Sequence, residues 1–559
     1  MFDFSNKSES EKTSFIMSNH AKLKNKRRVF EPFWDTLNSI FRPRRADFLT
    51  QREGQQYGKD VHDGHPQNNL NKFSNGLWSN MVNRSGEWLA FETPNQKVMR
   101  DDDVKGYFQD AADQIHSSFR RTNFYDEAPM SVKDGACAGP AVMVPQEDLV
   151  NGRIAYQSIH PRESYLENDG FGNAAVFHRE FPMSAVNAVD QFGRDKLPDN
   201  LVKNVDGPNP APFNEWDFIY AVYKNVNHRP NSLRPEDKKY VIFFIIQTND
   251  VNKTKMVAES GQNWFPVTWR MMPETNQAYG TTVCADALTE ALQVNALGRL
   301  GLQAVHRAVD PPLQALNTLR SLNLIRRKAG STTWKNNNNE EIKELYRQNG
   351  WPLGDAKEQR IHDSLDDKFS IAVFQALTGQ DLPQMTAFEV AQRKAEIAVL
   401  IGGVGSLQHE FLSNAIDVQW QFEDAAGRMP DPPQILLDET EGRVDVVFLG
   451  PLAVLQRSVL QGRNLVEGLA IAREVASLWP NTLIKINEMQ TMEDILFANG
   501  FKQRNMRSDS EVAEIQAAQA AEVEQERQLE VAERVVDMGA TANQPIERDG
   551  PLALLGATG

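Results

Sequence analysis

The chain has 559 residues, of which 40% are hydrophobic and 9% aromatic, so it has the apolar content to bury several packed units and is not of the disordered class. Its formal net charge of −15 argues against a protein that binds nucleic acid tightly and generally, because such binding depends on an excess of Lys and Arg. The alternative is that this negative charge only keeps a large protein soluble.

The N-terminal part of the chain is polar and then basic. Residues 1–20 are rich in Ser, Lys and Glu, a composition that predicts a disordered N-terminus. The basic run that follows suits either an arm that binds nucleic acid or the solvated face of a helix, which is the commoner case. The run consists of Lys22, Lys24, Lys26, Arg27 and Arg28. Further on, His62-Asp-Gly-His65 offers two metal ligands, but it stands in a loop without further ligands, so we expect no metal site and no cofactor.

A change of periodicity separates a helical region from a β-rich region. Apolar residues recur at helical spacing from residue 101 to about residue 130, and two glycines and a proline end that pattern by Pro140. Short runs rich in β-branched and aromatic residues then alternate with turn residues. We therefore expect a helical unit over residues 21–140 and a β-rich unit over residues 141–275. The runs predicted as strands are residues 153–159, 174–178, 218–223, 240–248 and 255–257.

Three long helices are predicted next, and the rest of the chain is organised around them. The first spans about residues 281–309 and stops at Pro311-Pro312, because proline cannot continue a helix. The second covers residues 355–378, and the third, from Thr386 to about residue 427, is the longest. The second helix carries one apolar residue at every fourth position, a stripe that we expect neighbouring copies of the chain to cover. The stripe consists of Ile361, Leu365, Phe369, Val373 and Leu377.

An insert and a loop connect these helices. The insert, residues 311–354, holds a positive cluster in a negative chain, which predicts a surface for an acidic partner or for DNA. The cluster consists of Arg320, Arg326, Arg327, Lys328 and Lys335, with Trp334 as a candidate interface anchor. Charge balance with nearby glutamates inside the insert remains the alternative. The loop has no Lys or Arg and consists of Thr378, Gly379, Gln380, Asp381, Leu382, Pro383, Gln384 and Met385.

The C-terminal part is predicted to be mostly helical. Residues 444–449 indicate one strand, and residues 451–505 a cluster of helices. From residue 506 the chain is rich in Ala, Gln and Glu with a thin apolar seam, followed by a flexible tail to residue 559. That seam suits either a helix in a ring of identical neighbours or an acidic, partly disordered tail.

Patterns typical of catalytic and membrane proteins are missing from the sequence. It contains no GxxxxGK[ST] phosphate loop, no GxSxG elbow and no HExxH helix, so we do not expect an enzyme. Cys137 and Cys284 lie in no CxxC or His-containing pattern, which argues against a disulfide framework or a zinc site. No apolar run approaches eighteen residues, so we expect neither a membrane span nor a secretion signal.

Several segments, taken in order, resemble the portal (head-to-tail connector) proteins of short-tailed bacteriophages. Asn68-Asn-Leu-Asn-Lys-Phe-Ser-Asn-Gly-Leu-Trp78 and Trp88-Leu-Ala-Phe91 are similar to the family's early helix and its exit. Phe265-Pro-Val-Thr-Trp-Arg270 with Ala278-Tyr-Gly280 resembles the strand and turn before its first stem helix. Thr386-Ala-Phe-Glu-Val390 resembles the start of its long wing helix. The resemblance covers roughly residues 20–500.

The resemblance implies an α+β, mainly helical subunit with named parts. Residues 21–140 and 141–275 become the helical and β-rich parts of a wing, and residues 386–450 its long helix and the following strand. Residues 276–310 and 355–378 become the two stem helices, residues 311–354 the clip and residues 379–385, with Thr378, the tunnel loop. Residues 451–505 become a helical crown, and residues 506–559 a helix and tail behind it.

The resemblance also implies a function and a set of partners. The subunits would form a dodecameric homo-oligomeric ring at one vertex of the capsid, through which double-stranded DNA passes during packaging and ejection. The partners would be the large terminase, tail adaptor proteins, and the major capsid and scaffolding proteins, with no membrane. The protein would be assembled in the host cytoplasm and lie in the virion, where a net negative charge would help DNA to slide. Another structural protein of the capsid interior or tail tube, without a DNA channel, is the alternative.

Overall fold

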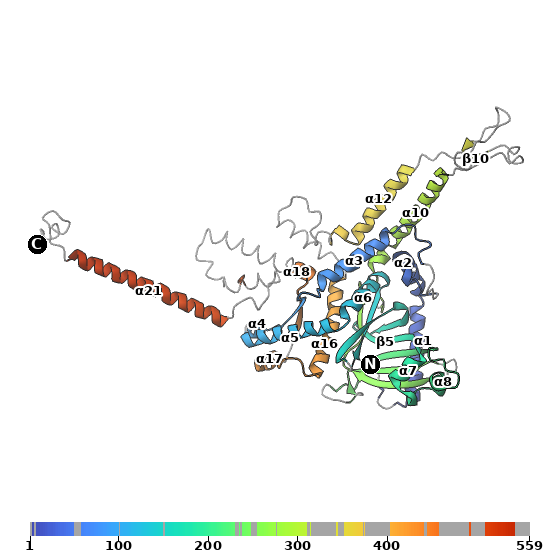
Figure 1. The fold of residues 1–559 in the computed structure, drawn as a ribbon, viewed down its shortest axis with the longest axis horizontal. Coiled ribbons are helices and arrows are strands. Elements are labelled where there is room, and N and C mark those ends of the chain that lie inside the picture. The colour runs from blue at the N-terminus through green and yellow to red at the C-terminus, as the bar shows by residue number, and fades with distance from the viewer. Residues whose placement is uncertain are drawn as a thin grey trace.

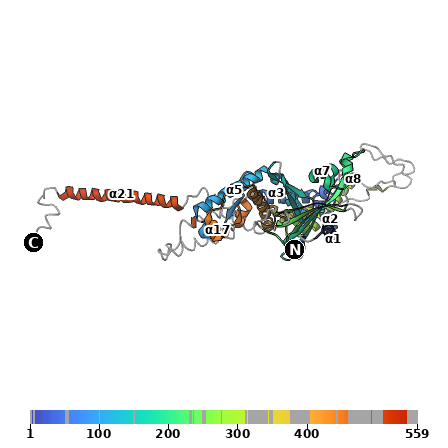
Figure 2. The ribbon, with the colours of Figure 1, turned by 90° about the horizontal axis from the view of Figure 1, so that it is seen from below.

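The computed structural model describes most of the chain. The described residues are 3–4, 7–49, 57–99, 101–148, 151–229, 234, 237–247, 254–275, 277–309, 313–314, 343–344, 351–372, 374, 403–440, 444–457, 491–492 and 509–542. They form a body of helices packed with β-sheets, from which the helices α10 (Leu288–Val309) and α12 (Trp351–Lys368) project together (Figure 1). A long helix, α21 (Asp509–Ala542), lies apart from that body in both views (Figures 1 and 2). The fold is therefore α+β, as predicted.

The N-terminus corrects the prediction of disorder for residues 1–20. Helix α1 spans Glu9–Arg27 and begins with a capping box, in which the side chains of Ser8 and Glu11 each accept a hydrogen bond from the other residue's backbone N–H. Ile16, His20 and Leu23 recur at helical spacing and are buried. Ile16 and Leu23 belong to one core with residues of the large sheet, so the helix is held by packing rather than by its weakly apolar composition.

Two antiparallel sheets lie in the region predicted to be β-rich, and residues 140–148 and 164–168 are strands that the sequence did not predict. The smaller has the order β3-β2-β9 and consists of β2 (Pro140–Asp148), β3 (Arg153–Ile159) and β9 (Val267–Arg270). The larger has the order β4-β5-β6-β7-β8. Its strands are β4 (Ser164–Asn168), β5 (Ala174–Ser184), β6 (Glu215–Lys224), β7 (Tyr240–Ile246) and β8 (Lys255–Gln262). Two short helices, α7 (Ala185–Phe192) and α8 (Asp199–Asp206), connect β5 to β6 and share a core with the larger sheet.

Helices from both ends of the chain complete the body. The N-terminal ones are α2 (Glu31–Phe41), α3 (His65–Met81), α4 (Gln96–Met99), α5 (Asp102–Arg121) and α6 (Phe124–Ala138). The C-terminal ones are α16 (Ser413–Ala425), α17 (Gln434–Thr440) and α18 (Pro451–Arg457). Strand β1 (Leu89–Glu92) pairs antiparallel with β12 (Asp445–Phe448), so the strand predicted near residue 444 joins the two halves of the sequence.

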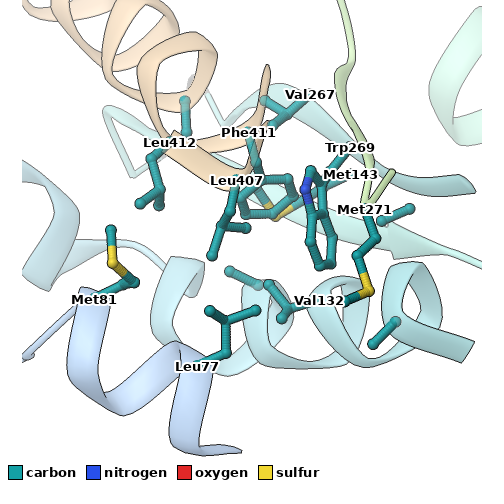
Figure 3. Packing of buried hydrophobic residues seen from close by; sticks show 14 of the residues in the cluster. Leu77, Met81, Val132, Met143, Val267, Trp269, Met271, Leu407, Phe411 and Leu412 are labelled. Carbon is teal, nitrogen blue, oxygen red and sulfur yellow. The ribbon is translucent and has the colours of Figure 1, made fainter. Parts of the chain in front are cut away.

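The largest hydrophobic core lies between helices and the three-stranded sheet. Figure 3 shows Leu77 and Met81 of α3 on one side of this core and Leu407, Phe411 and Leu412 on another, with Trp269 of β9 in the same cluster. Trp269 is fully buried, and its indole N–H donates to the hydroxyl of Ser406 at 3.0 Å. It packs directly on Gly135 of α6, where a Cβ atom would come within 2.4 Å of the indole ring. Glycine at that position therefore lets the helix and the sheet approach closely.

The second and third predicted helices have different boundaries from those expected. Helix α12 ends at Lys368, and Ser370 has a positive φ of 50°, so the four-residue apolar spacing continues through a turn rather than along one helix. Within the third, Gly403 has a φ of 86°, and helix resumes only after it, as α15 (Val404–Ser406), a π-helix (Leu407–Leu412) and α16. Glycine adopts this left-handed conformation at little cost, so the long helix is not continuous through residue 403. Residues 386–402 lie outside the described residues.

The C-terminal segment rich in Ala, Gln and Glu contains one long helix. Residues 509–542 form α21, and several of its apolar side chains are exposed, including Val523, Leu529 and Val531. Among the described residues, none of the helices combines the length and apolar character that crossing a bilayer requires.

Candidate functional site: the α10–α12 helix pair and its anchor

The chain returns on itself at the far end of the α10–α12 helix pair. α9 (Val283–Asp286) and α10 lead outward, α12 leads back, and the two long helices lie side by side (Figure 1). Beyond them, β10 (Leu313–Gln314) and β11 (Lys343–Glu344) pair antiparallel. The two ends of the predicted insert therefore meet at the tip of the helix pair.

Helix α10 has two apolar stripes with different surroundings. Ala291, Val294 and Gly298 follow one another at spacings of three and four, and the first two are fully buried. Leu292 and Leu300, eight positions apart on another side, are 43% and 57% exposed. Leu302 and Val305, near the outer end, are also exposed. A surface helix of a monomer usually keeps only one such stripe, so α10 presents apolar surface that the subunit itself does not cover.

The predicted stripe of the second helix is covered by the same chain. Ile361, Leu365 and Phe369 are all buried, and the ring centroid of Phe369 lies 5.9 Å from that of Phe41 and 6.0 Å from that of Phe73. The expectation that these three residues need a neighbouring copy for cover is therefore wrong, because they are already buried within the chain, Phe369 against α2 and α3. Val373 and Leu377 lie outside the described residues.

The turn after α12 fixes the helix pair to the body. At Ser370 the chain changes direction and brings Phe374 onto α3, where its ring meets that of Phe73 at a centroid distance of 5.8 Å. The same ring lies over Gly76, at which a Cβ atom would come within 2.6 Å of it. Glycine in α3 thus makes room for an aromatic side chain that holds the base of the helix pair.

One lysine links the two helices at their base. The ammonium of Lys368 donates to the backbone carbonyl of Asp286 at 2.7 Å and to Oε1 of Glu290 at 2.5 Å. Burial alone would raise the pKa of Glu290, but the hydrogen bond and the charge of Lys368 hold that pKa below its ordinary value.

The segment before α3 crosses both helices of the pair. The amide of Asn295 on α10 accepts from the backbone N–H of His62 at 2.7 Å and donates to the carbonyl of Asp60 at 2.9 Å. Gly298 lies under the same segment, where a Cβ atom would be 3.0 Å from the carbonyl oxygen of His62. On the other side, Nε2 of His65 lies 2.7 Å from Oδ1 of Asp366 on α12. Sequence reasoning missed these anchors, because each joins residues more than 230 positions apart.

The N-terminal basic run is engaged with the body. Lys24 and Lys26 pair with Glu180 and Glu167 at 3.0 and 2.5 Å. The guanidinium of Arg27 is buried and donates to the backbone carbonyls of Pro161 and Ser164. These contacts fit the face of a packed helix and do not fit a free arm that binds nucleic acid.

A second buried polar cluster ties α16 to α5. The carboxylate of Glu423 accepts from the hydroxyl of Ser118, from Gln114 at 2.9 Å and from Arg428 at 2.6 Å. Burial would raise the pKa of Glu423, but these hydrogen bonds and the charge of Arg428 together lower it. A carboxylate held in this way stays ionised and serves as a structural anchor.

The two regions predicted to meet DNA and partners lie outside the described residues. They are the loop residues Thr378, Gly379, Gln380, Asp381, Leu382, Pro383, Gln384 and Met385, and the insert residues Arg320, Arg326, Arg327, Lys328, Trp334 and Lys335. Within the insert, the structure describes residues 313–314 of β10, 343–344 of β11 and 351–354 at the start of α12.

Comparison with known proteins agrees with this architecture. The sequence model of a family described as bacteriophage head to tail connecting protein matches residues 14–506. The chain is 22% identical over 493 residues to the portal protein of Salmonella phage epsilon15, covering 86% of each chain. It is also 22% identical over 465 residues to the probable portal protein of Bordetella phage BPP-1, covering 81% of each. The protein therefore belongs to the bacteriophage head-to-tail connecting protein family.

Proposed function

We propose that this chain is the subunit of a phage portal: a ring at one vertex of the capsid whose axial channel carries DNA during packaging and ejection. The observation that carries the proposal is the family match over residues 14–506, together with two portal relatives that align over most of the chain. The role is structural and mechanical, with no catalytic step assigned to the chain.

The arrangement of the helix pair supports this function. Two helices that project from a body and end in a closed insert suit a subunit that presents one end to partners and keeps the other in the capsid (Figure 1). In this scheme α10 and α12 are the stem, residues 311–354 the clip, and the sheets with their covering helices the wing. The exposed Leu292 and Leu300 of α10 are where a neighbouring subunit would pack in the ring.

The insert is the proposed docking surface for the terminase and, later, the tail adaptors. Arg326, Arg327 and Lys328, repeated around a ring, would make a positive collar able to meet acidic protein faces or DNA phosphates. Changing these three residues to Glu should leave rings intact and weaken docking of the motor or adaptor. Unchanged binding of both partners to assembled triple-mutant rings would show that the cluster only balances charge within the insert.

The loop of residues 378–385 is the proposed constriction of the channel. It carries polar groups but no Lys or Arg, so it could touch DNA without gripping its phosphates. Shortening it by three or four residues should permit capsid assembly but impair packaging or retention of DNA. Normal packaging with the shortened loop would reject this role.

Electron microscopy of the purified full-length chain, with its native mass, tests the main proposal. We expect a closed ring of about a dozen subunits with an axial opening and cyclic symmetry. A stable monomer, or an open tube that grows with concentration, would instead favour a structural protein of the capsid interior or tail.

A further inference from the structure

Metal-ligating side chains from distant parts of the sequence meet beside α12. Glu358, His362 and Asp366 follow one another at four-residue spacing and so share one face of that helix. Asp63 and His65 stand at the start of α3, opposite this face. The imidazole rings of His65 and His362 stack with their centroids 4.1 Å apart and their planes at 23°.

The carboxylate of Asp63 is held in a fixed orientation. Its Oδ1 accepts a hydrogen bond from the backbone N–H of His65 at 2.6 Å, and its Oδ2 lies 2.8 Å from Nε2 of His362. The side chains of Asp63 and His362 are only 9% and 21% exposed. A hydrogen bond such as the one from the backbone of His65, made by a group that is not itself a ligand, orients a carboxylate toward a metal ion.

Glu358 completes a set of three ligands. One ligand atom each from Asp63, Glu358 and His362 lies within 4.8 Å of the other two. Around a tetrahedral ion with bonds of about 2.0–2.2 Å, neighbouring ligand atoms are about 3.3 Å apart. Small rotations of these side chains would therefore close the set around an ion.

We propose that Asp63, Glu358 and His362 bind one divalent ion of the Zn²⁺ type in each subunit. Ca²⁺ and Mg²⁺ prefer all-oxygen sets with more ligands, whereas one imidazole with two carboxylates suits Zn²⁺ and leaves a fourth position for water. His65 is a positioning residue, because its backbone N–H orients the carboxylate of Asp63 while its ring Nε2 lies 2.7 Å from Oδ1 of Asp366. This site revises the expectation, drawn from the sequence, that no metal binds.

The ion would fasten the helix pair to the body. Asp63 belongs to the segment that Asn295 already ties to α10, and the other two ligands belong to α12. One ion would thus join α10, α12 and the start of α3 at the base of the pair. The site does not depend on the proposed portal function.

Calorimetric titration of the chelator-treated full-length chain with ZnCl₂ tests the site. One saturable site per chain is expected, with Co²⁺ at the same stoichiometry giving the visible bands of a four-coordinate ion. Asp63→Asn and His362→Gln should lose at least 100-fold in Zn²⁺ affinity, and Glu358→Gln at least tenfold. The matched control, His306→Gln, removes an exposed histidine of α10 and should bind as the wild type does.

Glu358→Gln separates a metal site from an ion-pair cluster. Glu358 takes no part in the hydrogen bonds among Asp63, His65, His362 and Asp366, so its variant should keep the thermal midpoint of the metal-free protein. Zn²⁺ should raise that midpoint in the wild type but much less in the variant. Absence of saturable Zn²⁺ binding in the wild type, or wild-type affinity in Glu358→Gln, would overturn the proposal even if the other variants fail to fold.

Discussion

Helices α10 and α12 lie side by side, yet they differ in whether their apolar side chains are buried within the subunit. On α12 and the turn after it, Ile361, Leu365 and Phe369 are buried within the same chain, Phe369 against α2 and α3. On α10, Leu292 and Leu300 are left exposed. A regular apolar stripe thus shows that a helix face needs cover, but the neighbouring elements decide whether that cover comes from within the subunit.

The largest expected effect concerns the exposed stripe of α10. Replacing Leu292 and Leu300 together by Asp should abolish ring assembly, because charges would enter the surface proposed to meet the next subunit. The subunit itself should stay folded, since substitutions at exposed positions usually change stability by less than about 0.5 kcal/mol. Size-exclusion chromatography with light scattering measures assembly, and circular dichroism measures folding.

A matched double variant controls for the added charge. Phe171 and Phe213 are 92% and 80% exposed in the β-rich region, and changing both to Asp should leave rings intact. Rings of normal size from the Leu292 and Leu300 double variant would show that another surface joins the subunits.

For the buried residues at the end of α12 we expect a loss of subunit stability and not only of assembly. Phe369→Ala should lower the free energy of unfolding of the unassembled subunit by about 3–5 kcal/mol, because a fully buried ring is lost from the contact with Phe41 and Phe73. Denaturant unfolding checks this, with the exposed Phe171→Ala as control. A loss below about 1 kcal/mol would mean that α12 is not anchored as the structure shows.

A pair of glycine-to-alanine substitutions tests the close contact between α10 and the backbone of the segment before α3. Gly298→Ala should destabilise the subunit by about 1 kcal/mol despite alanine's better helix propensity, because the new methyl would press on the carbonyl of His62. That carbonyl cannot move easily, since Asn295 holds the backbone just before it, at the carbonyl of Asp60 and the N–H of His62. Gly106→Ala in α5 meets no atom within 4 Å and should stabilise by about 0.5–1 kcal/mol. Equal shifts of the thermal midpoint in the two variants would contradict this reading.

Local sequence signals predicted most strands of the larger sheet, but missed β2 and β4 and failed where distant contacts decide. The β-branched and aromatic runs at residues 218–223 and 240–248 lie in β6 and β7, because such residues pack well on a sheet. Helix α1 forms where the polar composition predicts disorder, and its local signals are the capping box of Ser8 and Glu11 and the helical spacing of Ile16 and Leu23. The break at Gly403 lies within the pair Gly402-Gly403, and glycine in the left-handed conformation is a common signal of a helix end.

The candidate sites were less predictable than the fold. Nothing in the apolar spacing around Ser370 indicates a turn with positive φ, because the stripe continues across it. His65 was identified as a possible ligand in a loop without partners, and its neighbours His362 and Asp366 lie about 300 residues away in the sequence. Only the packing of α3 against α12 brings these groups together.

The smallest expected effect concerns the ion pair that joins α10 and α12 at their base. Lys368→Met should cost only about 0.5 kcal/mol at neutral pH, because the side chains of Lys368 and Glu290 are 33% and 24% exposed and water screens the pair. The pKa of Glu290 is lowered in the folded subunit, so the pair stabilises it above the ordinary value of 4.5 and this contribution disappears as the pH falls through the folded pKa. The thermal midpoints of wild type and variant should therefore converge on acidification from neutral pH to below the folded pKa of Glu290. A difference that stays constant over this range would mean that Lys368 acts through its hydrogen bond to the carbonyl of Asp286 and not through its charge.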